Sequence, residues 1–178
     1  KNLKKLSKED KPFNLTMLTV DTHFPNGYIC DLCENKYDTT YGNAVACADR
    51  QVYDFVQWVK KQDFYKDTTI IIAGDHTSMV DTGSKFWTSL SNDYQRTVYN
   101  AIINPQCAYK KKVTAKRKFS TMDMFPTTLA ALGVEIDGNK LGLGTNLFSG
   151  EETLREQLGA NYINKELKRN DKMYNQFY

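Results

Sequence analysis

The hydrophobic and polar positions of this 178-residue chain follow two different spacings. Short runs rich in β-branched and other apolar residues, typical of buried strands, occupy residues 13–20, 69–73 and 97–105. Between the first two runs, apolar residues recur at helical spacing, which predicts an amphipathic helix from Asn43 to Lys61. Strands separated by a helix indicate an α/β fold, in which helices flank a sheet.

A second helix is indicated by its end signals. Ser120, Thr121 or Asp123 can cap the first turn, Pro126 fits inside that turn, and Gly133 ends the helix. Further glycines follow in the sequence and predict a loop over residues 141–150 that could bring the backbone close to another group.

Composition divides the chain further. Long loops are expected at residues 26–42 and 77–96, and short helices near residues 154–158 and 163–168. The divisions that we predict are a polar lead-in at 1–12, the main part of an α/β domain at 13–150, and a charged, partly helical tail of the same domain at 151–178.

The overall charge is close to neutral. The 24 lysines and arginines and the 21 aspartates and glutamates give a net charge of +3, which argues against a nucleic-acid partner. One basic run, residues 109–118, has six basic residues in ten and suits either a solvated loop or contact with an anionic lipid or polymer. No run approaches the roughly 18 apolar residues needed to span a membrane.

The four cysteines leave three interpretations open. Cys30 and Cys33 form a C-x-x-C pair, and Cys47 and Cys107 lie further along the chain. Disulfide bonds among Cys30, Cys33 and Cys47 would suit an oxidising compartment, whereas a structural zinc ion and free buried thiols are the alternatives. A thioredoxin-like motif is disfavoured, because the C-x-x-C pair lies in a polar loop instead of opening a helix.

Both histidines of the chain follow predicted strands. His23 comes shortly after the first apolar run, with Asp21 nearby, and Asp75 and His76 follow the second. Ligands of open α/β sheets gather beyond the carboxyl ends of strands, so we expect the two histidines near one another at one edge of the sheet. A carboxylate and an imidazole together suit Mn²⁺ or Zn²⁺, although a capped or solvated strand end without metal explains the pattern equally well.

Four blocks of sequence resemble one known family. In chain order, the blocks are FNLTMLTVDTHFPNGYICDLC, TTIIIAGDHTSM, FSTMDMFPTTLAALG and LGLGTNLFSG. They are similar to blocks of the membrane-anchored phosphoglycerol transferases, which include the enzymes that decorate periplasmic glucans and the lipoteichoic acid synthases. That family lies within the alkaline phosphatase and sulfatase superfamily. The resemblance covers residues 13–150 and implies the C-terminal part of a sulfatase- or alkaline-phosphatase-like sheet with flanking helices.

The resemblance implies roles for individual residues. In the superfamily an Asp-His pair after a strand binds the catalytic metal, and this role falls on Asp75 and His76. Mn²⁺ is the first expectation, with Mg²⁺ or Zn²⁺ as alternatives. His23 matches the histidine that contacts the phosphoryl group, and Asp21 would support these ligands or bind a second ion. The family's threonine nucleophile and a further acidic ligand lie upstream of these blocks, and Thr16 does not match the nucleophile.

The implied activity is the transfer of a phosphoglycerol group from an anionic phospholipid to a glycan or polyol acceptor, through a metal-assisted phosphothreonine intermediate. The resemblance also implies anchoring by N-terminal membrane helices, in a bacterial cell membrane with the catalytic domain on the periplasmic or extracellular side. Because the nucleophile lies outside the matching blocks, we expect this chain to be a C-terminal part that is inactive alone.

Two other functions stay open at this stage. A phosphoethanolamine transferase or a sulfatase would share the superfamily chemistry but act on a different substrate. A non-catalytic module would bind a glycan or lipid through Trp87, the tyrosines and the basic run that ends at Lys118.

Overall fold

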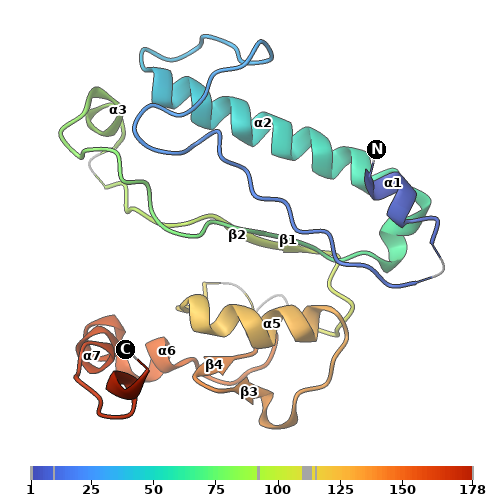
Figure 1. Ribbon diagram of the computed structural model, residues 1–178, viewed down its shortest axis with the longest axis vertical. Helices are drawn as coiled ribbons and strands as arrows, with labels where there is room; N and C mark the ends of the chain where they lie inside the picture. The colour runs from blue at the N-terminus through green and yellow to red at the C-terminus, as the bar shows by residue number, and fades with distance from the viewer. Residues whose placement is uncertain (1, 10, 92, 110–113, 115, 178) are drawn as a thin grey trace. The chain divides into compact units, whose positions relative to one another are not determined.

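The computed structural model describes residues 2–9, 11–91, 93–109, 114 and 116–177 (Figure 1). They form two compact units. The first unit contains the residues up to Lys66 together with Ile72–Asn100, and the second contains Asp67–Ile71 and the residues after Asn100. Helices alternate with short strands along the chain, which confirms the predicted α/β class.

The first unit is built on one long helix, α2 (Thr40–Lys60), visible in Figure 1. Thr39 caps this helix, because its side chain accepts a hydrogen bond from the backbone N–H of Gly42. The buried side chains of α2 include Ala44 and Val59, which are 0% and 2% exposed. The predicted amphipathic helix is therefore confirmed, and it begins one turn earlier than its apolar spacing indicated.

Shorter helical elements also occur in the first half of the chain. They are α1 (Asn2–Leu6), the 3-10 helix η1 (Asp63–Asp67) and α3 (Lys85–Thr88). α3 lies inside the region predicted to be a loop, so that prediction was wrong for four residues. The Ser84 side chain accepts from the N–H of Trp87 and caps α3, a local signal too short to stand out among neighbouring polar residues.

The predicted strand at residues 13–20 is wrong, because these residues form no regular secondary structure. Leu18 is 82% exposed and Val20 is 61% exposed, so the run is not buried either. A strand is stabilised by hydrogen bonds to a neighbouring strand, and the sheets found among the described residues provide none for this run. His23 consequently follows an irregular segment and not a strand end.

Two short strands follow the other apolar runs. β1 (Ile70–Ala73) and β2 (Asn100–Ile103) form a two-stranded sheet, and β2 is shorter than the predicted run at 97–105. Beyond β1, the N–H of Gly74 donates to the carbonyl of Tyr99 at 2.9 Å. The backbone around Gly74 is therefore held directly before the Asp-His pair.

The second unit has a small core around α5 (Met124–Ala131), which follows the 3-10 helix η2 (Thr121–Asp123). Ser120 and Asp123 form a capping box at the start, and Gly133 with a φ of +86° ends the helix. These are the residues that the sequence predicted for the two ends. Ala130 and Ala131 are 3% and 0% exposed and belong to the core.

A hairpin packs beside α5 in the second unit. It consists of β3 (Lys140–Leu141) and β4 (Gly144–Thr145), paired antiparallel after the 3-10 helix η3 (Asp137–Asn139). Residues 141–150 are thus partly a hairpin and not only a loop. Gly144 allows the hairpin backbone to approach the backbone carbonyl of Met122, which a Cβ at this position would overlap.

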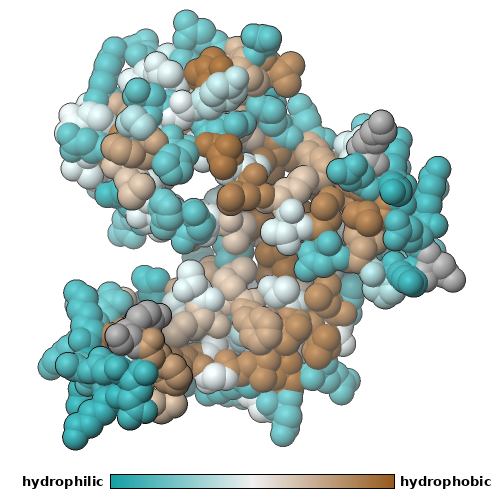
Figure 2. Space-filling view, viewed as in Figure 1, coloured by the Kyte–Doolittle hydropathy of each residue, from teal (hydrophilic) through white to brown (hydrophobic). Residues whose placement is uncertain are grey.

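The chain ends in short helices, α6 (Leu154–Leu158), α7 (Ala160–Leu167) and the 3-10 helix η4 (Tyr174–Gln176). The predicted helix at 154–158 is confirmed, and the one at 163–168 begins earlier than expected. Residues 110–113 and 115 of the basic run lie outside the described residues, so the interpretation of that run stays a prediction. The described helices include none with the length and apolar character of a membrane span. Figure 2 shows hydrophobic areas on the viewed surface, where many apolar side chains of both units are exposed.

Candidate active site

Asp75 and His76 follow β1 in the first unit and lie on its surface. Their side chains are 76% and 56% exposed. The N–H of His76 donates to Oδ1 of Asp75 at 2.8 Å, which turns the carboxylate toward the imidazole. Oδ2 of Asp75 is then 3.5 Å from Nε2 of His76. The two side chains are therefore held as a pair whose oxygen and nitrogen face one another.

The two histidines share one local arrangement. Nδ1 of His76 is 2.9 Å from the backbone carbonyl of Thr77, and Nδ1 of His23 is 2.7 Å from the carbonyl of Phe24. A carbonyl oxygen can only accept, so both contacts require the proton on Nδ1. In the neutral imidazole this assigns the lone pair to Nε2 in each ring. Both side chains are thus prepared to bind a cation or to accept a proton through Nε2.

Tyr41 joins the two loops that carry the histidines. Its hydroxyl donates to the backbone carbonyl of Thr22 at 3.1 Å and lies 2.8 Å from Oγ of Ser78. Thr22 precedes His23, and Ser78 is two residues after His76. The tyrosine is 7% exposed and lies in the first turn of α2. One buried hydroxyl therefore joins the loop of His23 to the loop of His76.

The loop that carries His23 is packed against α2. The N–H of Tyr28 donates to the carbonyl of Asp21 at 2.7 Å, which closes the loop. Gly27 has a φ of +68°, and a Cβ there would lie 2.5 Å from Cβ of Ala44 and 2.8 Å from the Asp21 carbonyl. Only glycine fits this approach. The predicted role of the Asp21 carboxylate stays a prediction.

The donor set of the pair fits a divalent cation. Zinc binds histidine nitrogen and carboxylate oxygen at about 2.0–2.2 Å, so one ion can contact two atoms that are 3.5 Å apart. Without a proton or a cation between them, a lone pair on Nε2 of His76 would face the negative oxygen of Asp75. Within the described part of the chain, no third histidine, cysteine, aspartate or glutamate joins these two in a cluster. A complete metal site would need further ligands, since zinc generally takes four.

The first unit also contains an open cavity of about 960 Å³, whose described lining residues do not include His23, Asp75 or His76. Phe86 of α3 is part of its wall and packs edge-on against Tyr41, with ring centroids 4.8 Å apart. Arg50, Glu34 and Tyr94 also line the cavity. Sequence reasoning missed both this cavity and the role of Tyr41, because no local spacing signals a contact between such distant residues.

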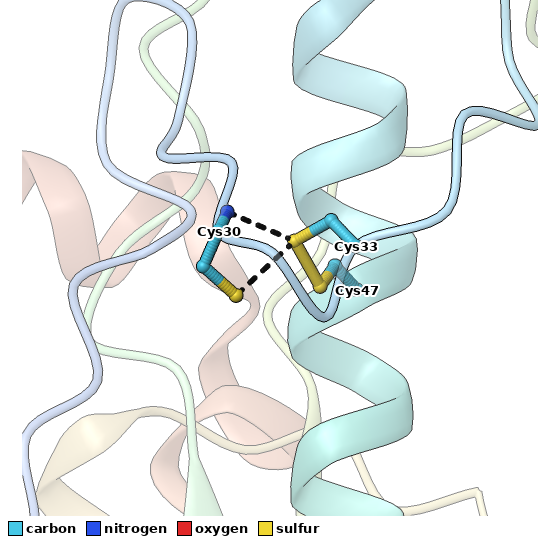
Figure 3. A group of neighbouring side chains, drawn as sticks. All are labelled: Cys30, Cys33 and Cys47. Carbon is cyan, nitrogen blue, oxygen red and sulfur yellow. Dashed lines mark hydrogen bonds between the residues drawn. A yellow bond between two sulfur atoms is a disulfide. The ribbon is translucent and has the colours of Figure 1, made fainter.

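The predicted group of cysteines also lies in the first unit. Cys33 and Cys47 form a disulfide bond, which ties the loop before α2 to the helix itself (Figure 3). Cys30 is a free thiol beside this bond. Cys107, in the second unit, is also free, and burial raises the pKa of its thiol.

Comparison with known proteins identifies the family. The family model described as Sulfatase matches residues 1–134. A phosphoglycerol transferase I from Shigella flexneri is 33% identical over 157 residues, which cover 85% of the chain and 19% of that protein. The proteins of the same name from Salmonella choleraesuis and Escherichia coli are 32% identical over the same shares.

The chain therefore spans 19% of the length of the curated relatives it matches. No solved structure is significantly similar to it. The family match extends over most of the chain and includes both histidines and the Asp75–His76 pair. These comparisons confirm the resemblance seen in the four sequence blocks, and the chain belongs to the sulfatase family, within the alkaline phosphatase and sulfatase superfamily.

Proposed function

We propose that this chain is the C-terminal part of a metal-dependent phosphoglycerol transferase. The observation that carries the proposal is the pair formed by Asp75 and His76, together with the Tyr41 hydroxyl that joins its loop to the loop of His23. Three relatives are named phosphoglycerol transferase I, which supports this substrate group over others of the superfamily.

Asp75 and His76 would hold a divalent cation through one carboxylate oxygen and Nε2. An oxygen and a nitrogen ligand suit Mn²⁺, with Mg²⁺ and Zn²⁺ as the other candidates. When bound, such an ion would supply positive charge to a phosphoryl oxygen. The hydrogen bonds to Asp75 Oδ1 and from His76 Nδ1 keep both ligand atoms in place before binding.

His23 would contact the phosphoryl group through Nε2. The carbonyl of Phe24 keeps the proton on Nδ1, so a neutral His23 can accept a proton at Nε2 and afterwards donate it to a leaving oxygen. We infer from the family resemblance that the nucleophile of the parent protein is a threonine outside these 178 residues. We therefore expect the isolated chain to show no transferase turnover and no stoichiometric metal.

The proposed donor is an anionic phospholipid, and the proposed acceptor is a glycan or polyol. We infer that the intact protein works at a bacterial cell membrane, with this domain on the periplasmic or extracellular side. No nucleic-acid partner is proposed.

The test uses the intact parent protein and measures diacylglycerol released from phosphatidylglycerol. We expect Asp75→Asn and His76→Ala each to lower kcat/KM by roughly 100-fold or more, as the loss of a transition-state charge contact does. Asp54→Asn is the matched control, because Asp54 lies on the exposed face of α2, and it should keep full activity. Full activity of His76→Ala would overturn the proposal.

The same assay separates the alternatives within the superfamily. Release of diacylglycerol from phosphatidylethanolamine, but not from phosphatidylglycerol, would identify a phosphoethanolamine transferase. Cleavage of an aryl sulfate alone would identify a sulfatase. A chain that binds glycans without metal while the parent shows none of these activities would support a non-catalytic module.

A further inference from the structure

Three sulfur atoms of the first unit converge at one place. Cys30, Cys33 and Cys47 each bring their sulfur within 4.8 Å of the other two. Figure 3 shows the three side chains turned toward one another. Cys33 and Cys47 are joined by a disulfide, and Sγ of Cys30 lies 3.6 Å from Sγ of Cys33. The free thiol therefore lies against one sulfur of the bond.

A metal ion is not the best occupant of this cluster. In the disulfide form only Cys30 retains a thiol, and one thiolate is a poor ligand set for zinc. A thiol 3.6 Å from a disulfide sulfur instead favours thiol–disulfide exchange, in which a thiolate attacks a neighbouring disulfide sulfur. Because all three sulfurs lie within 4.8 Å of one another, the attacking and leaving sulfurs are not in line, and the side chains must reorient before the attack.

We propose that Cys30, Cys33 and Cys47 form an internal thiol–disulfide exchange site. The thiolate of Cys30 attacks Sγ of Cys33, so the Cys30–Cys33 bond forms while the Cys33–Cys47 bond breaks. The electron pair of the broken bond goes to Sγ of Cys47, which takes up the proton that Cys30 released. One disulfide and one thiol are present before and after, so the step needs no oxidant or reductant.

Gln51 lies where it can assist both directions. Its Nε2 donates to Sγ of Cys47 at 3.3 Å and is 3.9 Å from Sγ of Cys30. The same amide thus faces the attacking sulfur and the leaving sulfur.

The exchange would release one attachment of the loop to α2 while preserving another. Asn43, in the first turns of α2, accepts from the N–H groups of Lys36 and Tyr37 at 2.9 and 2.8 Å. Its side-chain amide also donates to the carbonyl of Tyr37 at 2.8 Å. The loop therefore stays attached to α2 when the Cys33–Cys47 bond opens.

The exchange would affect the wall of the 960 Å³ cavity in the first unit. Cys47 and the loop from Glu34 to Thr39 form part of its wall. With the Cys30–Cys33 bond formed, the wall loses its covalent link to α2, whereas with the Cys33–Cys47 bond it is fixed. The cavity wall therefore has two states, one covalently linked to α2 and one not, and the pairing of Cys33 decides between them.

The test is a map of disulfides in the 178-residue chain carrying Cys107→Ser, which removes the fourth thiol. The protein is prepared without reductant at pH 8, quenched in acid, denatured, alkylated with N-ethylmaleimide and mapped by mass spectrometry. We expect two isomers, one with Cys30 alkylated and one with Cys47 alkylated. Because Nε2 of Gln51 lies nearer to Sγ of Cys47 than to Sγ of Cys30, Gln51→Leu should shift the population away from the isomer with free Cys47.

A second measurement does not depend on the equilibrium between isomers. In a Cys47→Ser variant treated with oxidised glutathione, Cys30 and Cys33 should form a disulfide with each other instead of two mixed disulfides with glutathione. The proposal is overturned if the first protein contains only the Cys33–Cys47 isomer and the variant carries glutathione on both cysteines. A stoichiometric zinc ion with three protected thiols would overturn it as well.

Discussion

The second unit buries and pairs the carboxylate of Asp123, whereas the first unit leaves the Asp75–His76 pair exposed. Asp123 is 2% exposed, and its carboxylate accepts from the N–H groups of Thr145 and Ser120, each at 2.8 Å. Asp75 and His76, in contrast, are more than half exposed. Across the described residues, every buried side-chain nitrogen and oxygen has a hydrogen-bond partner.

The difference in burial distinguishes a carboxylate that stabilises the fold from one that is free to bind a ligand. A buried carboxylate that accepts several N–H bonds has no free lone pairs that point to solvent, so Asp123 stabilises the junction of η2, α5 and β4. Asp75 keeps Oδ2 directed at His76 and open to solvent. In the sequence alone, Asp123 and Asp75 look alike, because each is a carboxylate near a predicted helix or strand end.

The largest effect is expected at Arg117 of the second unit. Its guanidinium makes two 2.8 Å contacts to the Glu156 carboxylate and also donates to the carbonyls of Leu147 and Ser149. Arg117→Ala leaves the largely buried carboxylate without this partner, so the free energy of unfolding should fall by about 3–5 kcal/mol. Urea denaturation of the 178-residue chain measures the loss.

Arg169 provides a matched control for that prediction. It pairs with Glu166 at the same 2.8 Å, but its side chain is 73% exposed, against 11% for Arg117. Exposed pairs contribute about 0–1 kcal/mol, so Arg169→Ala should change the stability little. Equal losses for the two variants would contradict the distinction between buried and exposed pairs.

The next largest effect is expected on acidification. The Arg117 guanidinium, followed by N–H groups of the backbone, lowers the pKa of Glu156 to about 2 from an ordinary 4.5. A lowered folded-state pKa contributes stability that is complete above the unfolded-state value and is lost as the pH falls through the folded-state value. The chain should therefore lose on the order of 2–3 kcal/mol from this group between pH 4.5 and pH 2.

Glu156→Gln isolates this contribution from that of other carboxylates. The difference in unfolding free energy between the wild type and Glu156→Gln should shrink as the pH falls from 4.5 toward 2, because the wild-type carboxylate becomes neutral over that range. A difference that stays constant down to pH 2 would show that the ionisation of Glu156 does not stabilise the second unit.

The elements that sequence predicted well depend on contacts between near neighbours. η2, which leads into α5, begins at a capping box, α5 ends before Gly133, and α6 begins where Thr153 and Glu156 form another capping box. These signals lie within a few residues of one another, so they can be read from the sequence. Residues 13–20 carry an equally clear apolar pattern, but a strand also needs a partner elsewhere in the chain.

The candidate site was predicted in part for the same reason. His23, Asp75 and His76 stood out because of their residue types and the apolar runs before them. Tyr41 did not, because its two hydrogen bonds reach residues 19 and 37 positions away. No local pattern marks such contacts, and the sequence placed the tyrosine in the loop before the predicted helix.

The smallest effect on stability, and the most selective one, is expected for Tyr41→Phe. The change removes only the hydroxyl that contacts Thr22 and Ser78, so the free energy of unfolding should fall by about 1 kcal/mol, as for a typical hydrogen bond. In the intact parent, kcat/KM for phosphatidylglycerol should fall by about 10-fold or more, because small displacements of reacting groups have large effects on rate.

Tyr53→Phe is the control for this last comparison, since Tyr53 lies on the same helix but is 61% exposed. It should alter neither the stability nor the activity. If Tyr41→Phe lost stability but kept full activity, the tyrosine would be a structural residue like Thr127, whose hydroxyl is buried and bonded within the second unit. A loss of activity far larger than the loss of stability would instead show that the first unit uses this buried hydroxyl to position two exposed histidines.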